Sequence, residues 1–401
     1  MLLVRALLYI WVTVCSKGLV MLLKYGGHNF YCFKDEFEVD LRLNKNCPKG
    51  ISQGKDYSNV MCIKGANAAG KTNALKAFSF LCNFVTNSFN NKPDKKIVVE
   101  SYFSNTLPIS LFSEFRINSE EYRYELTTTK TEVISEKLIN LGKVSSILFS
   151  REGDDIIELD EDFEKLRSIP QIRSNASLIS VANQHEIDCI SDVHDFFYNS
   201  ISNVKNNGFK DLLEDDVHRF YHDIPKALTF ARDLLVKFDT GISDILIDTY
   251  TNSEDEEIFY PVFIFDIEGD KKSLRLQHQS SGTRRLYYLL GYCFLVINYA
   301  ENLPYSRVFI ADELDLHLHS KILPEITKLF EESENTQLIF TCQNDQILDD
   351  MGKYRTVLIN KEENESYIYR LDELPSDLLR NGRPISPHYA SGNIGGVPEI
   401  G

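Results

Sequence analysis

Residues 65–72 combine two glycines, a lysine and a threonine in the spacing G-x-x-x-x-G-K-[ST], which suits phosphate binding. In such a loop, successive backbone N–H groups and the dipole of the following helix make a concave anion site. The glycines would let the backbone approach phosphate closely, Lys71 would reach the β- and γ-phosphates, and the Thr72 hydroxyl would bind Mg²⁺. The predicted nucleotide contacts are Gly65, Ala66, Asn67, Ala68, Ala69, Gly70, Lys71, Thr72 and Asn73.

The sequence predicts a strand before this loop and a helix after it. Residues 60–63 form a short apolar run typical of a buried strand, and apolar residues recur at helical spacing over residues 75–85. We expect the helix to continue to about residue 89, because two asparagines, a lysine and a proline follow. The loop would therefore join a strand to the N-terminus of a helix, as phosphate binding requires.

A second group of chemically active residues lies at the end of another apolar run. Residues 307–311 read as a buried strand, and Asp312 and Glu313 follow it directly. Asp312 would accept a hydrogen bond from a Mg²⁺-bound water, so the predicted metal-binding residues are Thr72 and Asp312. Glu313 would polarise the attacking water as general base, with Lys71 as a second catalytic residue.

A Ser-Gly pair precedes a long predicted helix. Residues 280–285 read S-S-G-T-R-R, and the apolar residues that follow recur on one helical face. The backbone at such a helix start can bind an anion. An ordinary helix cap formed by Ser281 is the alternative interpretation of this segment.

Several segments, in order along the chain, resemble the ABC-type ATPase heads of SMC, RecF and double-strand-break-repair ATPases. The chain is most similar to the compact ATPases of prokaryotic phage-defence and abortive-infection loci, such as the ATPase component of PARIS-like two-gene systems. The resemblance implies an α/β fold, a P-loop NTPase of ABC-ATPase type with an inserted helical lobe. The segments that carry the resemblance are residues 29–35, 65–72, 173–180, 280–285, 312–319 and 389–398.

The resemblance also implies that two heads form a homodimer or higher oligomer and share ATP and Mg²⁺ at their interface. Ser281 and Gly282 would bind the γ-phosphate of ATP held by the other subunit. Asp315 would face the partner across that ATP. His319 matches a family position after Asp315, so we do not interpret His317 and His319 as a metal pair.

One departure from the family pattern concerns the segment after the predicted strand 337–341. Gln343 stands where relatives usually have a histidine near the γ-phosphate. A glutamine side chain can donate a hydrogen bond to phosphate but cannot become cationic. We therefore expect Gln343 to contribute to catalysis, with slower or more tightly gated hydrolysis.

The expected organisation has four parts. Residues 1–20 would be an N-terminal extension, with Met21 as the working start, and residues 21–165 would form the first part of the head. Residues 166–240 would be the helical lobe, and residues 241–401 the second part of the head.

Strands are expected at 21–25, 30–33 and 37–41, and a hairpin over 115–126. The aromatic residues of the lobe are expected in its core rather than against nucleic-acid bases; they are Phe196, Phe197, Tyr198, Phe220 and Tyr221.

Composition narrows the range of functions. The chain has 401 residues, 43% of them hydrophobic, and a formal net charge of −16, which argues against a broad, sequence-blind nucleic-acid surface. None of its eight cysteines forms a C-x-x-C pair, so reduced thiols and a cytoplasmic location are expected. The apolar residues 2–14 are too few to span a bilayer comfortably, and no membrane association is expected.

The function predicted from these observations is an ATP-dependent switch. Its resemblance to defence ATPases implies that it senses infection through a phage-derived trigger and holds or releases a separate toxic effector such as a nuclease. A DNA-repair ATPase of RecF or SMC type is one alternative. A scaffold stabilised by ATP with little turnover is another. A stand-alone toxin, with catalysis in the helical lobe, ranks last because that lobe shows no nucleophile or metal constellation.

Overall fold

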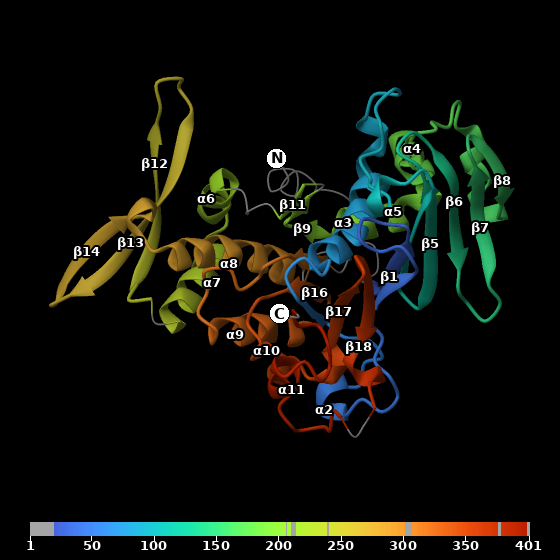
Figure 1. Ribbon diagram of the computed structural model, residues 1–401. Coiled ribbons are helices and arrows are strands. Elements are labelled where there is room, and N and C mark those ends of the chain that lie inside the picture. Colours follow the sequence, from blue (N-terminus) through green and yellow to red (C-terminus); the bar gives the residue numbers. More distant parts are fainter. Residues whose placement is uncertain are drawn as a thin grey trace. The chain divides into compact units, whose positions relative to one another are not determined.

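The computed structural model describes residues 20–205, 207–209, 214–238, 240–300, 307–375 and 378–398 (Figure 1). The expected N-terminal extension lies outside the described residues, apart from its last residue. The contacts divide the chain into two compact units. The first unit contains the described residues up to 209, residues 307–314 and the described residues from 327 onward. The second contains residues 214–300, except the undescribed 239, and residues 315–326.

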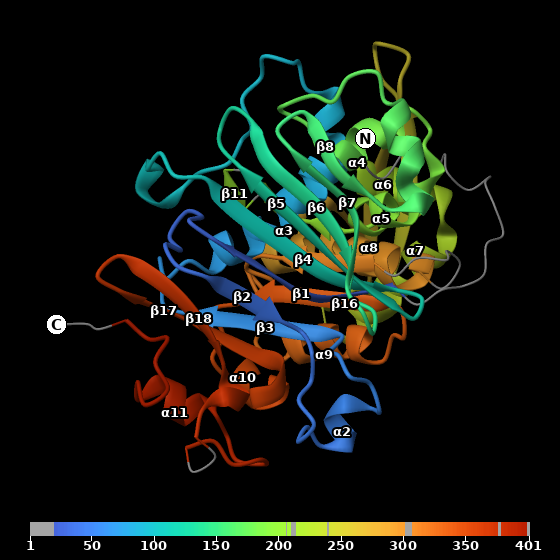
Figure 2. The ribbon, with the colours of Figure 1, turned by 90° about the vertical axis from the view of Figure 1, so that its right-hand side faces the viewer.

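An antiparallel sheet forms one side of the first unit (Figure 2). Among the described residues it has seven strands in the order β2-β1-β4-β5-β6-β7-β8. Strand β4 alternates regularly between buried and half-buried residues, as expected for a sheet with one face toward the core. Their bounds are β1 Val20–His28, β2 Phe37–Asp40, β4 Ile109–Ile117, β5 Glu120–Thr128, β6 Val133–Asn140, β7 Ser146–Glu152 and β8 Asp155–Leu159.

A second sheet of the first unit is mainly parallel. Its described strands are ordered β18-β17-β3-β16-β15-β9, and all neighbours except β17 and β18 run parallel. Strands β3, β15 and β16 are buried along their whole length, which explains the apolar runs at their centres. The bounds are β3 Val60–Gly65, β9 Ile201–Ser202, β15 Arg307–Ala311, β16 Thr336–Thr341, β17 Thr356–Glu362 and β18 Glu365–Arg370.

Helix α3 (Lys71–Asn87) contacts strands of both sheets, including β1, β4, β3 and β16. Its apolar residues are buried over most of its length, so it forms the centre of the core between the sheets. The remaining helices and short strands of this unit are α2 Lys49–Ser52, α4 Leu178–Gln184, α5 Ser191–Tyr198, β10 Val204–Lys205, β11 Gly208–Phe209, α10 Ile347–Met351 and α11 Ser386–Ala390.

The second unit packs helices against a three-stranded antiparallel sheet of described strands, ordered β12-β13-β14. One face of β13 meets the helices, since the Phe259 ring contacts His222 and the Phe263 ring contacts Tyr287. The bounds are α6 Glu214–Asp223, α7 Pro225–Lys237, β12 Asp244–Thr251, β13 Glu257–Ile267, β14 Asp270–Arg275 and α8 Ser281–Ala300. Helix α9 (Ile322–Glu331) begins in this unit and ends in the first.

The expected helical lobe, residues 166–240, is divided between the two units. Helices α4 and α5 belong to the first unit because they pack on α3. The rings of Phe196 and Phe115 stack with centroids 4.3 Å apart, so α5 is part of the core of the head. Helices α6 and α7 belong to the second unit, and Pro225 is the first residue of α7, a position that tolerates proline. Of the five aromatic residues expected in the core, all but the half-buried Tyr198 are buried.

Two expectations about strands have different outcomes. The hairpin over 115–126 is confirmed, since β4 pairs antiparallel with β5. The prediction of a strand at residues 30–33 is wrong, because Phe30 and Phe33 form only an isolated bridge across a tight turn. Asn29 (φ 54°) and Tyr31 (φ 50°) take left-handed conformations there, which an extended strand does not allow.

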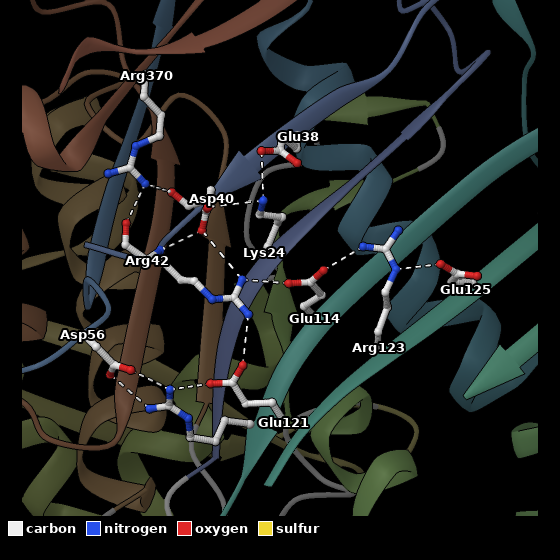
Figure 3. A network of polar contacts seen from close by, with 11 residues as sticks. Lys24, Glu38, Asp40, Arg42, Asp56, Glu114, Glu121, Arg123, Glu125 and Arg370 are labelled. Atoms are coloured by element: carbon white, nitrogen blue, oxygen red, sulfur yellow. Dashed lines mark hydrogen bonds and ion pairs between the residues drawn. The ribbon is translucent and has the colours of Figure 1, made fainter. Parts of the chain in front are cut away.

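A network of ion pairs and hydrogen bonds includes contacts between the two sheets of the first unit (Figure 3). Glu114 of β4 accepts from Arg42 and Arg123 at 2.7 Å each, and its burial, which alone would raise its pKa, is outweighed so that its pKa is lowered. Arg370 of β18 donates to the backbone carbonyl oxygens of Asp40 (2.7 Å) and Arg42 (2.6 Å). The Arg370 guanidinium, from the mainly parallel sheet, thereby fixes the backbone of residues 40–42 at the end of β2 in the antiparallel sheet.

A fully buried ion pair connects the far side of the antiparallel sheet to α4. Glu136 of β6 lies 2.8 Å from Nε of Arg151 in β7, and both side chains are 0% exposed. The same carboxylate accepts hydrogen bonds from the Tyr124 hydroxyl (2.9 Å), the Ser177 hydroxyl (2.7 Å) and the Leu178 backbone N–H (2.9 Å). Glu136 thus holds the N-terminus of α4 and supplies the counter-charge of the buried Arg151.

Replacing this carboxylate is expected to destabilise the first unit strongly. Glu136→Gln leaves the buried Arg151 charge without a counter-charge, which costs about 3–5 kcal/mol of unfolding free energy. Urea unfolding followed by circular dichroism would measure the loss. The matched control is Glu38→Gln, whose exposed pair with Lys24 contributes less than about 1 kcal/mol. Equal effects of the two substitutions would contradict the structural role of Glu136.

Candidate functional site

The predicted phosphate loop lies between β3, which ends at Gly65, and α3, which begins at Lys71. Both glycines of the motif are required by close contacts. A Cβ atom on Gly65 would lie 2.5 Å from the carbonyl oxygen of Ile359, and one on Gly70 would lie 2.6 Å from Cys32 Sγ. Gly70 also has a φ of 113°, which disfavours other residues. The loop therefore has no side chain at these two positions, which suits a backbone that a phosphate group must approach closely.

Lys71 is buried, and its ammonium is bound to the loop itself. Its Nζ donates to the carbonyl oxygens of Gly65 (2.9 Å) and Ala66 (3.0 Å). Burial lowers the pKa of Lys71, and repulsion from Lys64 lowers it further. A phosphate group would offer this ammonium a charged acceptor, which forms stronger hydrogen bonds than neutral carbonyl groups.

The carboxylate of Asp312 is the meeting point of three elements. Asp312 follows β15 and is only 2% exposed. Its Oδ2 accepts from the Thr72 hydroxyl at 2.6 Å, and its Oδ1 accepts from the Thr341 hydroxyl at 2.5 Å. Thr72 lies on α3 and Thr341 ends β16, so the carboxylate ties the helix after the phosphate loop to two neighbouring strand ends.

Glu313, the predicted general base, follows directly and is half-buried. It has a φ of 47°, and its backbone N–H donates to the Thr341 hydroxyl at 2.9 Å. One threonine therefore fixes both carboxylate residues. Because neighbouring parallel strands end on the same edge of a sheet, the structure brings residues 65–72, Asp312, Glu313 and the segment after Thr341 together.

Sequence reasoning missed Asn203 and Thr341. Asn203 is buried, and its side chain accepts from Asp312 N at 2.7 Å and donates to Asp312 O at 2.9 Å. It follows β9, whose two residues are too few to be recognised from a pattern. Thr341 is recognisable only as the last residue of a predicted strand, which gives no sign of its contacts.

The other predicted residues of this unit lie beside the loop. Asn73 donates from Nδ2 to Cys32 Sγ at 3.3 Å, which ties α3 to the turn after β1. Gln343 is exposed, two residues past the end of β16, and its backbone carbonyl accepts from Lys64 Nζ at 2.6 Å. Lys64 is a further residue that sequence reasoning missed.

Ser281, Gly282 and Asp315 belong to the second unit, which is described by itself. The alternative interpretation of this segment, a helix cap formed by Ser281, does not match the contacts, because the Ser280 hydroxyl accepts from Thr283 N (3.1 Å). Ser281 is the exposed first residue of the helix. A Cβ atom on Gly282 would lie 2.7 Å from the carbonyl oxygen of His317, so only glycine fits between α8 and this loop.

The oxygen atoms around Asp312 fit a magnesium–nucleotide complex. Mg²⁺ in such sites is held by one or two protein oxygens, with waters and substrate phosphates completing its octahedron. The Thr72 hydroxyl and the Asp312 carboxylate are such oxygens, and they meet at the start of the phosphate-loop helix. The donor chemistry thus suits the cofactors expected from the motif.

No helix in the described part of the chain is long and apolar enough to cross a membrane.

No curated protein gave a match to this chain. Two solved structures have low similarity: an SMC head bound to the C-winged helix domain of ScpA, and an SMC head domain from Thermotoga maritima. The first has 13% identity and a TM-score of 0.48, covering 87% of this chain and 96% of that one. The second has 12% identity and a TM-score of 0.43, covering 87% and 98%. Both TM-scores lie below 0.5, so we base no argument on either.

A family model matches residues 60–349, which include the phosphate loop, the Asp312–Glu313 strand end and Gln343. Its description is "AAA domain, putative AbiEii toxin, Type IV TA system". The match covers more than half of the chain and confirms the resemblance to ATPases of abortive-infection systems and the α/β P-loop fold class. The chain therefore belongs to this family of AAA-domain proteins.

Proposed function

We propose that the protein binds and hydrolyses ATP and uses the cycle as a switch. The observation that carries this proposal is the buried Asp312 carboxylate, shared by the Thr72 and Thr341 hydroxyls. It connects the phosphate loop to the strand ends on which a nucleotide's phosphates would lie. The family, an AAA domain of toxin–antitoxin type, supports nucleotide hydrolysis as the class of activity.

Each residue of the proposed site has a distinct task. Lys71 exchanges the carbonyl groups of Gly65 and Ala66 for phosphate oxygens when nucleotide binds. Thr72 and Asp312 would hold Mg²⁺, which when bound would neutralise charge on the phosphates of the nucleotide. Glu313 accepts a proton from the attacking water, and its backbone is already fixed by Thr341. Gln343 donates a hydrogen bond toward the γ-phosphate.

The proposed switch is a dimer or higher oligomer in which Ser281, Gly282 and Asp315 of one subunit complete the site of another. Ser281 is exposed at the start of a long helix, where backbone N–H groups are available to an anion. A shared site couples nucleotide binding to association, because ATP then stabilises only the assembled state. Hydrolysis through Glu313 would return the subunits to the open state.

The biological role that we propose is anti-phage defence in the cytoplasm, where ATP is available. The toxin–antitoxin description of the family supports a regulator that holds or releases a separate toxic effector, such as a nuclease, in response to a phage-derived trigger. The net charge of −16 disfavours a DNA-repair role. An ATP-stabilised scaffold is the second candidate, because the uncharged Gln343 favours slow turnover.

Replacement of the general base is expected to separate binding from hydrolysis. Glu313→Gln should lower the turnover number for ATP by about 10²-fold or more, since a positioned base contributes at least that much. ATP binding should remain, whereas Lys71→Ala should lose it. Phosphate release and binding of a fluorescent ATP analogue measure both, with the exposed Glu332→Gln as the control. Unchanged turnover in Glu313→Gln would exclude Glu313 as the base.

A shared site makes a prediction about association. Ser281→Arg places a bulky cation where the proposed partner's nucleotide would bind, so ATP-dependent assembly should be lost while ATP binding to the single subunit is retained. Size-exclusion chromatography with light scattering, with and without ATP, measures this. Ser119→Arg, in the exposed turn between β4 and β5, is the matched control. Assembly that survives Ser281→Arg contradicts the shared site.

The defence role predicts a physical partner. Tagged Glu313→Gln protein, purified from its native cells, should retain a stoichiometric small protein, and Lys71→Ala protein should show a changed amount of it. Mass spectrometry would identify a co-purifying protein, and staining for nucleic acid with and without nuclease treatment would identify co-purifying DNA. DNA without protein would instead support the repair alternative.

A further inference from the structure

Lys64 is a buried lysine next to the phosphate loop to which the mechanism above assigns no task. It is the second-last residue of β3, directly before Gly65, and only 2% exposed. Its Nζ donates to the backbone carbonyl oxygens of Gln343 (2.6 Å) and Cys342 (3.3 Å). It also lies 2.8 Å from Oδ1 of Asp345.

These partners all come from one short segment, residues 342–345, beyond the end of β16. A buried ammonium is tolerated only when hydrogen bonds and counter-charges replace its water. The segment supplies both, and the Tyr389 ring lies below the cation, 5.6 Å from Nζ. The position of the segment and the solvation of Lys64 therefore depend on each other.

The same cation also influences the phosphate loop. The pKa of Lys71 is lowered by burial and, to a smaller extent, by repulsion from Lys64. Lys64 is thus covalently part of the strand that leads into the loop and non-covalently bound to the segment that carries Gln343. It connects the two sides of the proposed γ-phosphate site.

We propose that Lys64 is a positioning residue for ATP hydrolysis, which holds the backbone of residues 342–345 so that the Gln343 side chain meets the γ-phosphate. This proposal rests on the proposed function of the site. Gln343 lies at the exposed surface beside the phosphate loop, and its backbone carbonyl is one of the groups that Lys64 binds. The shortest contact of Lys64 is to the carbonyl group of that residue, and a misplacement of about 1 Å can cost about 10²-fold in rate.

The carbonyl contacts rather than the ion pair are expected to carry this effect. The Asp345 side chain is 50% exposed, so water and salt screen its pairing with Lys64. Asp345→Asn should therefore change the turnover number by less than about threefold. Lys64→Met, which keeps the length of the side chain and removes its charge, should lower it by about tenfold or more, with the KM for ATP within about threefold.

The test combines hydrogen exchange with kinetics on the full-length protein. In Lys64→Met, amide exchange should rise in the peptide covering residues 342–346 and stay unchanged in the antiparallel sheet. A matched control is Lys55→Met, since Lys55 also donates to a backbone carbonyl, that of Ser333, but lies before the other end of β3. If Lys64→Met does not fold, Lys64→Gln, which keeps a donor without the charge, replaces it.

A double-mutant cycle with Gln343→Ala distinguishes positioning from general destabilisation. If Lys64 acts through the Gln343 side chain, Lys64→Met should cost less than about threefold in the Gln343→Ala background. Additive losses, or unchanged exchange in residues 342–346, would overturn the proposal. If the wild-type protein hydrolyses no ATP, the proposed function fails instead, and the exchange measurement still decides whether Lys64 holds the segment.

Discussion

The Asp312 carboxylate is almost fully buried, and hydroxyl groups from a helix and a strand satisfy its two oxygen atoms. An unpaired carboxylate would be costly in this position, so Thr72 and Thr341 must stay where they are as long as it is charged. Asn203 fixes the backbone of the same residue from a third strand. The geometry of the whole site follows from this one requirement, because the phosphate loop, Glu313 and the segment of Gln343 all adjoin these residues.

Two lysines near the site are bound mainly by backbone carbonyl groups, but with different consequences. Lys71 binds carbonyl groups of its own loop and can leave them when a more highly charged acceptor arrives. Lys64 binds carbonyl groups of a different segment and has an aromatic ring below it. The contacts of Lys71 suit a group that moves during the reaction, and the contacts of Lys64 suit a group that keeps two parts of the chain together.

The sequence allowed prediction of those parts of the site that are local in the chain. The phosphate loop and the Asp312–Glu313 strand end have their own spacing and flanking patterns, and the structure has both at strand ends, as predicted. Asn203 and Lys64 could not be predicted, because their roles depend on residues 109 and 279 positions away. The turn at Phe30 was misjudged for a different reason: its apolar residues resemble a strand, while backbone conformations with positive φ decide the outcome.

The parallel sheet joins segments that are far apart in the chain. Strand β3 pairs with β16 and β17, and Thr72 meets Asp312 across 240 positions. Contacts of such long range form late, because a large loop must close before they contribute. On the ribosome, the phosphate loop emerges long before its partners, so the nucleotide site can form only when most of the chain has been made. An interrupted translation product would therefore contain the loop motif without a site, and only nearly complete molecules could take part in ATP-dependent regulation.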